Sequence, residues 1–371
     1  MKYRILVTGG AGFIGSHLVD CLIKEGHSVR ILDNLESQVH QNKKPDYLNS
    51  KAEFVLGDIR NENDLAKAID DVEVILHNAA SVGVGQSMYE IQKYVDNNTY
   101  GTAKLLQVLI DKDNDIKKLI VASSMSIYGE GAYECDKCGV VYPKLRPISQ
   151  LKKQEWEMKC PTCGKNVKPV PTPEEKPLYP TSIYAITKRD QEEMCLTIGQ
   201  SYGIPTVALR YFNTYGTRQS LSNPYTGVAA IFSSRIKNNN PPLIFEDGLQ
   251  SRDFISVYDI VQANLLAIKK SNANYDTFNV GTGKPTTVLE IAEKLIKLYD
   301  KKLKSKIVNK YRAGDIRHCF ADISKIKKLG FKPSVNLDDG LLELKEWGNS
   351  ISAEDKVDLA KVELEKKGLV I

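Results

Sequence analysis

The sequence predicts an α/β fold built on a parallel sheet, because short β-branched runs alternate with amphipathic stretches over its first third. The predicted strands are residues 4–8, 28–33, 53–56, 72–77 and 118–123. The stretches between them are long enough for helices that cross from one parallel strand to the next. A length of 371 residues and an apolar content of 42% allow a large core with additions. We therefore expect a doubly wound sheet with helices on both faces.

The chain divides into five segments where this rhythm starts, stops or changes. These segments are residues 1–129, 130–173, 174–212, 213–347 and 348–371. The first and third predict the sheet domain, since a helix at 181–202 and a strand at 206–210 resume the pattern. The second, with four cysteines and several prolines, predicts an insertion with its own small fold. The fourth predicts a smaller mixed domain with strands that return to the core. The fifth predicts a helical extension that docks through Leu369, Val370 and Ile371.

The composition excludes several classes of protein. Lysine and arginine total 51 against 46 acidic residues, and the C-terminal lysines are interleaved with glutamates, so we expect no nucleic-acid partner. No run approaches the roughly 20 apolar residues of a membrane span, and no signal-peptide pattern is visible, so we expect no membrane partner and a cytoplasmic location. Four of the seven cysteines form two close pairs, which indicates metal binding rather than disulfides, while Cys21, Cys195 and Cys319 resemble core residues.

A glycine-rich motif directly follows the first predicted strand and opens a helix. Gly9, Gly12 and Gly15 permit a tight turn, close approach of a pyrophosphate and close helix packing. The helix N-terminus then faces the anion. Asp33 ends the second strand, where its carboxylate can accept hydrogen bonds from the adenosine ribose. The motif predicts a Rossmann-type dinucleotide site, the alternative being glycines that serve only the turn.

The residues after the second and third strands favour NAD over NADP. A carboxylate at Asp33 repels the additional phosphate of NADP, and Asn34 and Leu35 follow it where an arginine would be needed. Asp58 and Ile59, after the third strand, are placed to contact the adenine. We therefore expect NAD as the cofactor.

The sequence predicts that Ser124, Tyr184 and Lys188 form a catalytic set. Tyr184 and Lys188 are one helical turn apart on the same face. A phenol with a pKa near 10 is a poor base at neutral pH, but the lysine and a positively charged nicotinamide favour its phenolate. Tyr184 would take the proton of a sugar hydroxyl as hydride leaves the same carbon, with Ser124 bridging the two oxygens. The alternative is a Tyr and Lys at this spacing by chance.

Residues 3–330, interrupted by the cysteine insertion, resemble the extended short-chain dehydrogenase/reductases of the NAD-dependent epimerase/dehydratase family. Besides these motifs, the likeness includes residues 77–80, 98, 101–102, 210–213, 252–254 and 312–315. The motifs and the resemblance together give the expected cofactor contacts: Gly9, Gly12, Phe13, Ile14, Gly15, Asp33, Asn34, Asp58, Ile59, Ala79, Ala80, Tyr184, Lys188 and Tyr211. The expected substrate contacts are Ser87, Ser124, Asn213, Arg252, Arg312 and Asp315. By resemblance, Tyr211 lies near the nicotinamide, Asn213 contacts the substrate diphosphate, and the two arginines bind its phosphates.

The residues after Ser124 narrow the reaction within the family. The family's 4,6-dehydratases carry an Asp-Glu pair there, and its decarboxylases resemble them in carrying a Glu, whereas this chain has Met125 and Ser126. The remaining chemistry is epimerisation at C4, in which hydride returns to the other face of a 4-ketone. Residues 82–87, 219–227 and the C-terminal end resemble dTDP-L-rhamnose 4-epimerases, with UDP-glucose 4-epimerases close. Ile91 stands where the family often has proline, which leaves the sugar-facing loop undefined.

Two C-x-x-C pairs in the insertion predict a metal site. Cys135 and Cys138 are separated from Cys160 and Cys163 by 21 residues, as in zinc ribbons. Four thiolates leave no open coordination position, so a structural zinc is expected ahead of iron, the alternative being reduced cysteines without metal. The insertion would be a rigid flap beside the sugar pocket or a subunit contact.

The remaining expectations concern assembly and rival functions. By family analogy the helices near residues 98–110 and 181–202 would pair across a homodimer. His77 is expected to be a packing residue, and Asn98 to have a structural role in its helix. The rivals are a 4,6-dehydratase, a simple oxidoreductase, and an NAD-binding sensor or scaffold without catalytic activity.

Overall fold

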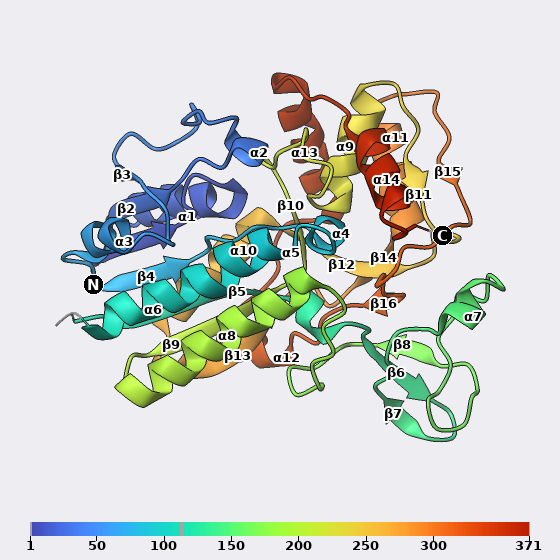
Figure 1. Ribbon diagram of the computed structural model, residues 1–371, viewed down its shortest axis with the longest axis horizontal. Helices are drawn as coiled ribbons and strands as arrows, with labels where there is room; N and C mark the ends of the chain where they lie inside the picture. The colour runs from blue at the N-terminus through green and yellow to red at the C-terminus, as the bar shows by residue number, and fades with distance from the viewer. Residues whose placement is uncertain (1, 112–114, 371) are drawn as a thin grey trace.

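A seven-stranded parallel sheet forms the centre of the molecule (Figure 1). The computed structural model describes residues 2–111 and 115–370. The strand order of the seven-stranded sheet is β13-β9-β5-β4-β1-β2-β3. The strands are β1 (Arg4–Thr8), β2 (Ser28–Asp33), β3 (Glu53–Leu56), β4 (Val74–His77), β5 (Lys118–Ser124), β9 (Thr206–Tyr211) and β13 (Asp276–Val280). The predicted α/β fold with a parallel sheet is confirmed, and the predicted strand at 72–77 begins two residues later, at Val74.

Helices cover both faces of this sheet, because its central strands are apolar on both sides. All residues of β4, β5 and β9 are buried, as in parallel sheets covered twice. On one face α1 (Phe13–Lys24) packs with α10 (Val257–Lys269) through residues such as Leu18, Leu22 and Ile260. On the other face α3 (Glu62–Ile69), α6 (Gly101–Asp111) and α8 (Ile183–Tyr202) contribute Leu65, Leu105 and Cys195, respectively, to a second apolar cluster.

The chain after β9 builds a smaller mixed layer beside the carboxyl ends of the sheet. Its strands are β10 (Asn213–Tyr215), β12 (Ser251–Ser256), β14 (Pro285–Thr287), β16 (His318–Cys319) and the pair β11 (Leu243–Ile244) and β15 (Lys306–Ile307). The helices α9 (Val228–Lys237), α11 (Val288–Leu298) and α13 (Leu337–Ser350) surround a separate core. One strand of this region, β13, returns to the main sheet, where it pairs with β9.

The cysteine insertion has a small fold of its own, at the lower right of Figure 1. Its strands β6 (Ala132–Cys135), β7 (Gly139–Val141) and β8 (Lys168–Val170) form an antiparallel sheet, and α7 (Ile148–Leu151) follows β7. Its core contains Tyr133, Val141, Met158 and Val167 beside the cysteines.

Short helices and the C-terminal helix complete the fold. The short helices are α2 (Ser37–His40), α4 (Val84–Ser87), α5 (Ile91–Tyr94) and α12 (Ser324–Lys327). The helix α14 (Val357–Lys366) lies within the expected extension, and beyond it the carbonyl of Leu369 accepts a hydrogen bond of 2.9 Å from the amide of Ala313. The chain end therefore docks as expected through residues 369 and 370, while Ile371 lies outside the described residues. Among residues 2–111 and 115–370, no helix is both long and apolar enough to cross a membrane.

Candidate active site

A cleft of about 650 Å³ opens between the carboxyl ends of the sheet and the smaller layer. This is where doubly wound folds bind ligands. Every expected cofactor residue lies in its lining: Gly9, Gly12, Phe13, Ile14, Gly15, Asp33, Asn34, Asp58, Ile59, Ala79, Ala80, Tyr184, Lys188 and Tyr211. Five of the six expected substrate residues also line it: Ser124, Asn213, Arg252, Arg312 and Asp315. The structure thus gathers both expected sets around one cavity.

The glycine loop between β1 and α1 has no room for larger side chains. A Cβ atom added at Gly15 would lie 2.2 Å from the carbonyl oxygen of Gly9. Gly9 has φ +66°, and its added Cβ would lie 2.9 Å from the backbone of Ala79. No side chain caps the N-terminus of α1, so its amide groups can face an anion in the cleft. The loop fits the pyrophosphate of a dinucleotide.

The two aspartates expected at the ribose and the adenine are held in fixed orientations. Asp33 accepts hydrogen bonds from the amides of Ala11 at 3.0 Å and Leu35 at 2.9 Å, so it braces the glycine loop as well as facing the cleft. Asp58 accepts hydrogen bonds from Arg60 and from the Asn34 side chain. Burial raises the pKa of Asp58, but these hydrogen bonds outweigh that effect and lower it to about 2. Asp58 is therefore a permanent acceptor at neutral pH.

Ser124 and Tyr184 meet in the middle of the cleft. Ser124 ends β5, and its hydroxyl oxygen accepts hydrogen bonds from the amide and hydroxyl of Ser126. Tyr184 belongs to the first turn of α8, which Ser182 caps by accepting a hydrogen bond from Ala185. Burial raises the pKa of Tyr184, and a hydrogen bond with Ser124 acts against that rise. The sequence led us to expect a phenolate favoured by the lysine and by a bound, positively charged nicotinamide. Of the two effects on the pKa in the protein itself, burial is the larger.

Lys188 lies one turn further along α8 and is buried. Its Nζ donates a hydrogen bond of 2.7 Å to Oε1 of Gln191. The same Gln191 side chain contacts His77, Thr102 and the carbonyl of Ala79. Burial lowers the pKa of Lys188 to about 8. Sequence reasoning missed Gln191, although its position three residues after the lysine places it on the same helix face.

Two polar residues flagged in the sequence are structural. His77 is buried between the hydroxyl groups of Thr8 and Thr102, at 2.8 Å and 2.9 Å, and burial lowers its pKa to about 3. Asn98 lies in a π-helical turn (Val95–Tyr100), accepts a hydrogen bond from the amide of Ser81 and donates one to Thr187. Both expectations of a packing or structural role agree with these contacts.

The far half of the cleft carries amide and guanidinium groups. The Oδ1 atom of Asn213 is buried without a hydrogen-bond partner, so it can receive a donor from a ligand. Arg252 donates to the backbone carbonyls of Ser251, Ile316 and Arg317. These bonds use three of the five N–H donors of a guanidinium and leave the others for the cleft.

Arg312 lies further out in this half. Its guanidinium stacks 4.7 Å from the centre of the Phe245 ring, and its Nε donates to Asp315 at 2.7 Å. Arg312 also lines the cleft. This arrangement suits phosphate oxygens.

Ser87 is the one expected substrate residue that the structure places elsewhere. It is fully buried and absent from the cleft lining. Its hydroxyl accepts a hydrogen bond of 3.0 Å from the amide of Tyr184 and donates one of 2.7 Å to the carbonyl of Val84. These contacts do not support the expected substrate contact, because α4 turns this side chain toward the start of α8 rather than into the cavity.

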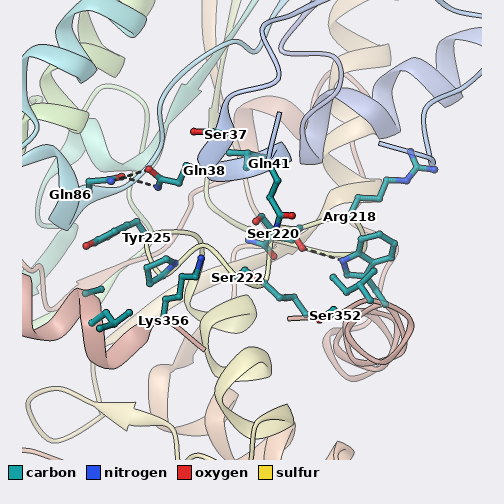
Figure 2. Close-up of a pocket in the computed structure, with 18 of the residues that line it drawn as sticks. Ser37, Gln38, Gln41, Gln86, Arg218, Ser220, Ser222, Tyr225, Ser352 and Lys356 are labelled. Atoms are coloured by element: carbon teal, nitrogen blue, oxygen red, sulfur yellow. Dashed lines mark hydrogen bonds between the residues drawn. The ribbon is translucent and has the colours of Figure 1, made fainter. Parts of the chain in front are cut away.

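A second pocket of about 450 Å³ adjoins the cleft (Figure 2). Figure 2 shows Gln38 of α2 and Gln86 of α4 pointing toward each other, joined by two hydrogen bonds of 3.0 Å. Both glutamines line the pocket and the cleft, so this amide pair forms a shared wall. On the far side, the indole of Trp347 donates to the carbonyl of Gln219. Helix α14 reaches both cavities through Ala360.

Comparison with known proteins places this site in a family. The family model described as "NAD dependent epimerase/dehydratase family" matches residues 5–150 and 161–281. The chain belongs to this family. It is 32% identical to dTDP-L-rhamnose 4-epimerase of Burkholderia thailandensis over 348 residues, which is 93% of this chain and 94% of that protein. It is 36% identical to a putative UDP-glucose 4-epimerase of Methanocaldococcus jannaschii over 346 residues, 92% of this chain and 97% of the relative.

The chain also resembles a relative whose structure contains bound ligands. The UDP-glucuronic acid 4-epimerase of Bacillus cereus, solved with UDP-glucuronic acid and NAD, superposes with a TM-score of 0.78 at 29% identity, covering 94% of this chain and all of that one. These relatives are NAD-dependent 4-epimerases of nucleotide sugars. The match to the family model is interrupted at residues 151–160, which lie inside the cysteine insertion.

The insertion differs from the expected flap. None of its described residues, 130–173, lines the cleft. Instead it packs behind the segment that follows β15, where Trp156 lies against Tyr311 with ring centroids 6.5 Å apart. The insertion therefore lies against that segment rather than along the cleft.

The four paired cysteines come together in the insertion. The sulfur atoms of Cys135, Cys138, Cys160 and Cys163 all lie within 4.8 Å of one another, and two of these residues are buried. Four sulfurs about 2.3 Å from one zinc ion would be separated by roughly 3.8 Å. The Sγ atoms of Cys135 and Cys163 are 3.6 Å apart, so the donor set fits a tetrahedral metal.

Proposed function

We propose that this protein is an NAD-dependent 4-epimerase of a nucleotide-activated hexose. The observation that carries the proposal is the position of Ser124, Tyr184 and Lys188. They lie in the same cleft as the glycine loop and the phosphate-suited arginines. A dinucleotide bound at the loop and a sugar nucleotide bound at the arginines would both reach Tyr184. The family's known 4-epimerases support the same reaction.

Tyr184 is the proton acceptor and donor in this proposal. NAD, when bound, supplies a reversible acceptor for the hydride of C4. The phenol oxygen of Tyr184 takes the proton of the 4-hydroxyl group, with Ser124 hydrogen-bonded between the two oxygens. Lys188 stabilises the phenolate by its charge, and Gln191 holds the ammonium in place. After the 4-ketone has turned over, Tyr184 returns the proton to the same oxygen.

The residues after Ser124 argue against elimination or decarboxylation. Met125 is buried and apolar, and Ser126 is committed to hydrogen bonds with Ser124. Neither can act as the carboxyl group that a 4,6-dehydratase uses at these positions. Proton transfer at one oxygen is the chemistry that remains.

The substrate that we propose is a dTDP- or UDP-hexose. Arg252 and Arg312 would bind its diphosphate, with Asp315 orienting Arg312. Asn213 would donate or accept a hydrogen bond through its amide, whose oxygen is otherwise without a partner. A sugar placed between these groups and Tyr184 would have its C4 hydroxyl near Ser124.

We also propose a structural zinc ion in the four-cysteine cluster. The separations of the sulfurs and the two C-x-x-C turns support zinc, and four thiolates leave no position for a reacting ligand. A reducing cytoplasm would keep these thiols available. The metal would stabilise the insertion rather than take part in catalysis.

A homodimer is the proposed assembly. Helix α8 and the π-helical turn before α6 pack together and carry exposed apolar side chains, among them Val95, Tyr100, Ile186 and Tyr202. Burying them between two copies would remove apolar surface from water. Light scattering on the purified protein would test this directly, and a monomeric mass would contradict it.

The experiment that tests the function is product analysis with a panel of UDP- and dTDP-hexoses. Purified protein should interconvert one pair of C4 epimers, visible by NMR, without net formation of NADH. The Tyr184→Phe variant should keep bound NAD and lose turnover by two or more orders of magnitude. Accumulating NADH would indicate an oxidoreductase, a 4-keto-6-deoxy product a dehydratase, and full turnover by Tyr184→Phe would end the catalytic assignment.

A further inference from the structure

The insertion makes hydrogen bonds and apolar contacts to the stretch of chain that carries two of the expected substrate contacts. We name residues 310–322 the clamp segment, since Arg312 and Asp315 belong to it. At its start, Tyr311 forms a small apolar cluster with Leu151 and Trp156 of the insertion. At its end, Thr172 donates its amide to Phe320 at 2.8 Å and accepts the amide of Asp322 at 2.9 Å. Both ends of the clamp segment thus rest on the insertion.

A buried arginine of the insertion reaches the middle of the clamp segment. Arg146 is almost fully buried, at 1% side-chain exposure, and pairs with Glu246 through two hydrogen bonds of 2.7 Å and 2.9 Å. Its Nη2 also donates to the carbonyl of Asp315 at 3.3 Å, and its Nη1 to the carbonyl of Trp156. A buried charge with these four hydrogen bonds has one low-energy position, so it fixes the backbone at Asp315.

Two glutamates of the insertion bind Arg317 and His318 of the clamp segment. Glu130 is buried and accepts the amides of Arg317 at 2.8 Å and His318 at 2.7 Å. Glu157 accepts hydrogen bonds from the Arg317 guanidinium, which also binds Glu246 and Asp247. Arg317 is fully buried, so these carboxylates compensate a charge that has no access to water.

These contacts continue to the second expected phosphate contact. Arg252 donates to the carbonyls of Ile316 at 2.7 Å and Arg317 at 2.9 Å. Any shift of the clamp segment therefore moves the guanidinium of Arg252 as well as Arg312 and Asp315. The cofactor half of the cleft has no such dependence, since the glycine loop is held by Asp33 and by a hydrogen bond from the amide of Gly9 to the carbonyl of Leu32.

The cysteine cluster lies next to the insertion residues that contact the clamp segment. Glu157 is three residues before Cys160, and between them Met158 packs in the cluster's apolar core. The carbonyl of Met158 accepts the amide of Val167, and the amide of Cys160 donates to Lys165 at 2.7 Å, which folds this stretch back on itself. A metal shared by the four sulfurs would lock the stretch and, with it, Glu157 and Trp156.

From these contacts we propose that the four-cysteine module positions the nucleotide-diphosphate half of the active site. Metal in the module sets the affinity for the diphosphate, through Arg146, Glu157 and the clamp segment, without touching the ligand. Arg146 is a positioning residue in this scheme. The inference rests on the proposed function only for the substrate class, a nucleoside diphosphate.

The first test compares metal-loaded and metal-free protein. Metal content is measured on the full-length protein, which is then stripped with a chelator or made as Cys160→Ser, with Cys21→Ser as the matched control. We expect the Kd of UDP or dTDP to rise about tenfold or more without metal, as for lost outer-shell partners, while bound NAD stays constant. Amide hydrogen exchange should speed up in residues 310–322 and stay unchanged in residues 9–15. A purified protein without metal, or equal nucleotide affinity in both forms, would overturn the proposal.

The second test separates positioning from folding. Arg146→Lys keeps the charge beside Glu246 but loses the fork that also reaches Asp315, and Lys168→Met changes an exposed residue of the same module. We expect Arg146→Lys to raise KM for the sugar nucleotide about tenfold with kcat within twofold, and Lys168→Met to change neither. A fall in kcat at unchanged KM would refute a diphosphate role for Arg146. Metal-dependent UDP binding by a protein that epimerises no hexose would support this inference and contradict the proposed function, and epimerisation with metal-independent affinity would do the reverse.

Discussion

Replacing Ser87 with alanine should slow the chemical step rather than weaken substrate binding. The Ser87 hydroxyl is fully buried and accepts the amide of Tyr184 at 3.0 Å, at the start of α8. Ser87→Ala leaves that amide without a partner, which costs about 1–3 kcal/mol of folding stability. The same loss releases the backbone that carries the phenol. We expect kcat to fall about tenfold, which corresponds to ~1.4 kcal/mol in the barrier, with KM nearly unchanged.

Urea unfolding and steady-state kinetics measure the two effects together. The matched control is Asn336→Ala, which removes the side-chain cap of α13 and costs about 1 kcal/mol far from Tyr184. This control should lose stability and keep kcat. A rise in KM at constant kcat in Ser87→Ala would refute the reasoning and restore the substrate contact that the family resemblance implied.

Four further predictions rest on single contacts or groups. Gly15→Ala places a Cβ atom 2.2 Å from a backbone oxygen of the same loop, so the purified protein should contain little NAD, as measured by absorbance after denaturation. Because burial lowers the pKa of Lys188 to about 8, its ammonium is lost as pH rises through that value, and kcat should fall on the alkaline side. Gln191→Leu removes an acceptor that stabilises the ammonium, so that limb of the kcat profile should move to lower pH, and an unmoved limb would contradict this role. Glu192→Gln leaves the buried Arg210 with its charge uncompensated, and thermal or urea unfolding should reveal a loss of about 3–5 kcal/mol, whereas a loss below 1 kcal/mol would contradict it.

The cofactor half of the site could be predicted from sequence because its determinants are local. The turn from Gly9 to Gly15 and the strand that ends in Asp33 carry their own signals, the spaced glycines and a short strand rich in β-branched and apolar residues. Tyr184 and Lys188 are likewise neighbours on one helix. Such short-range patterns survive in any tertiary context, and the structure places all of these residues in the cleft lining.

Residues whose roles depend on contacts between distant segments could not be predicted in the same way. Ser87 and Tyr184 are 97 positions apart, and no periodicity connects them. The direction in which α4 turns Ser87 is set by packing against α8, which the sequence alone does not reveal. The resemblance supplied a site residue here, but the physical contact that uses the hydroxyl is to the protein's own backbone.

The insertion contains both local sequence signals and residues whose roles depend on contacts with distant segments. The two C-x-x-C pairs are local signals and predicted that the four sulfurs would meet, as they do within 4.8 Å. What the module does for the rest of the molecule depends on Arg146 and Glu246, which are 100 positions apart, and on Arg317 beyond them. A flap was expected because the insertion leaves the sheet beside the cleft. Its buried charges instead turn it toward the clamp segment.

The two halves of the cleft are held in place by different kinds of constraint. The glycine loop is fixed by steric limits that tolerate almost no change, since added atoms at Gly9 or Gly15 would overlap the backbone. The half that carries Arg252, Arg312 and Asp315 is fixed by hydrogen bonds to the cysteine insertion. On our proposal, strengthening or loosening the insertion would change the affinity for the sugar nucleotide while leaving NAD binding intact. The buried pair of Arg146 and Glu246, at 1% and 3% side-chain exposure, is where such a change would act most directly.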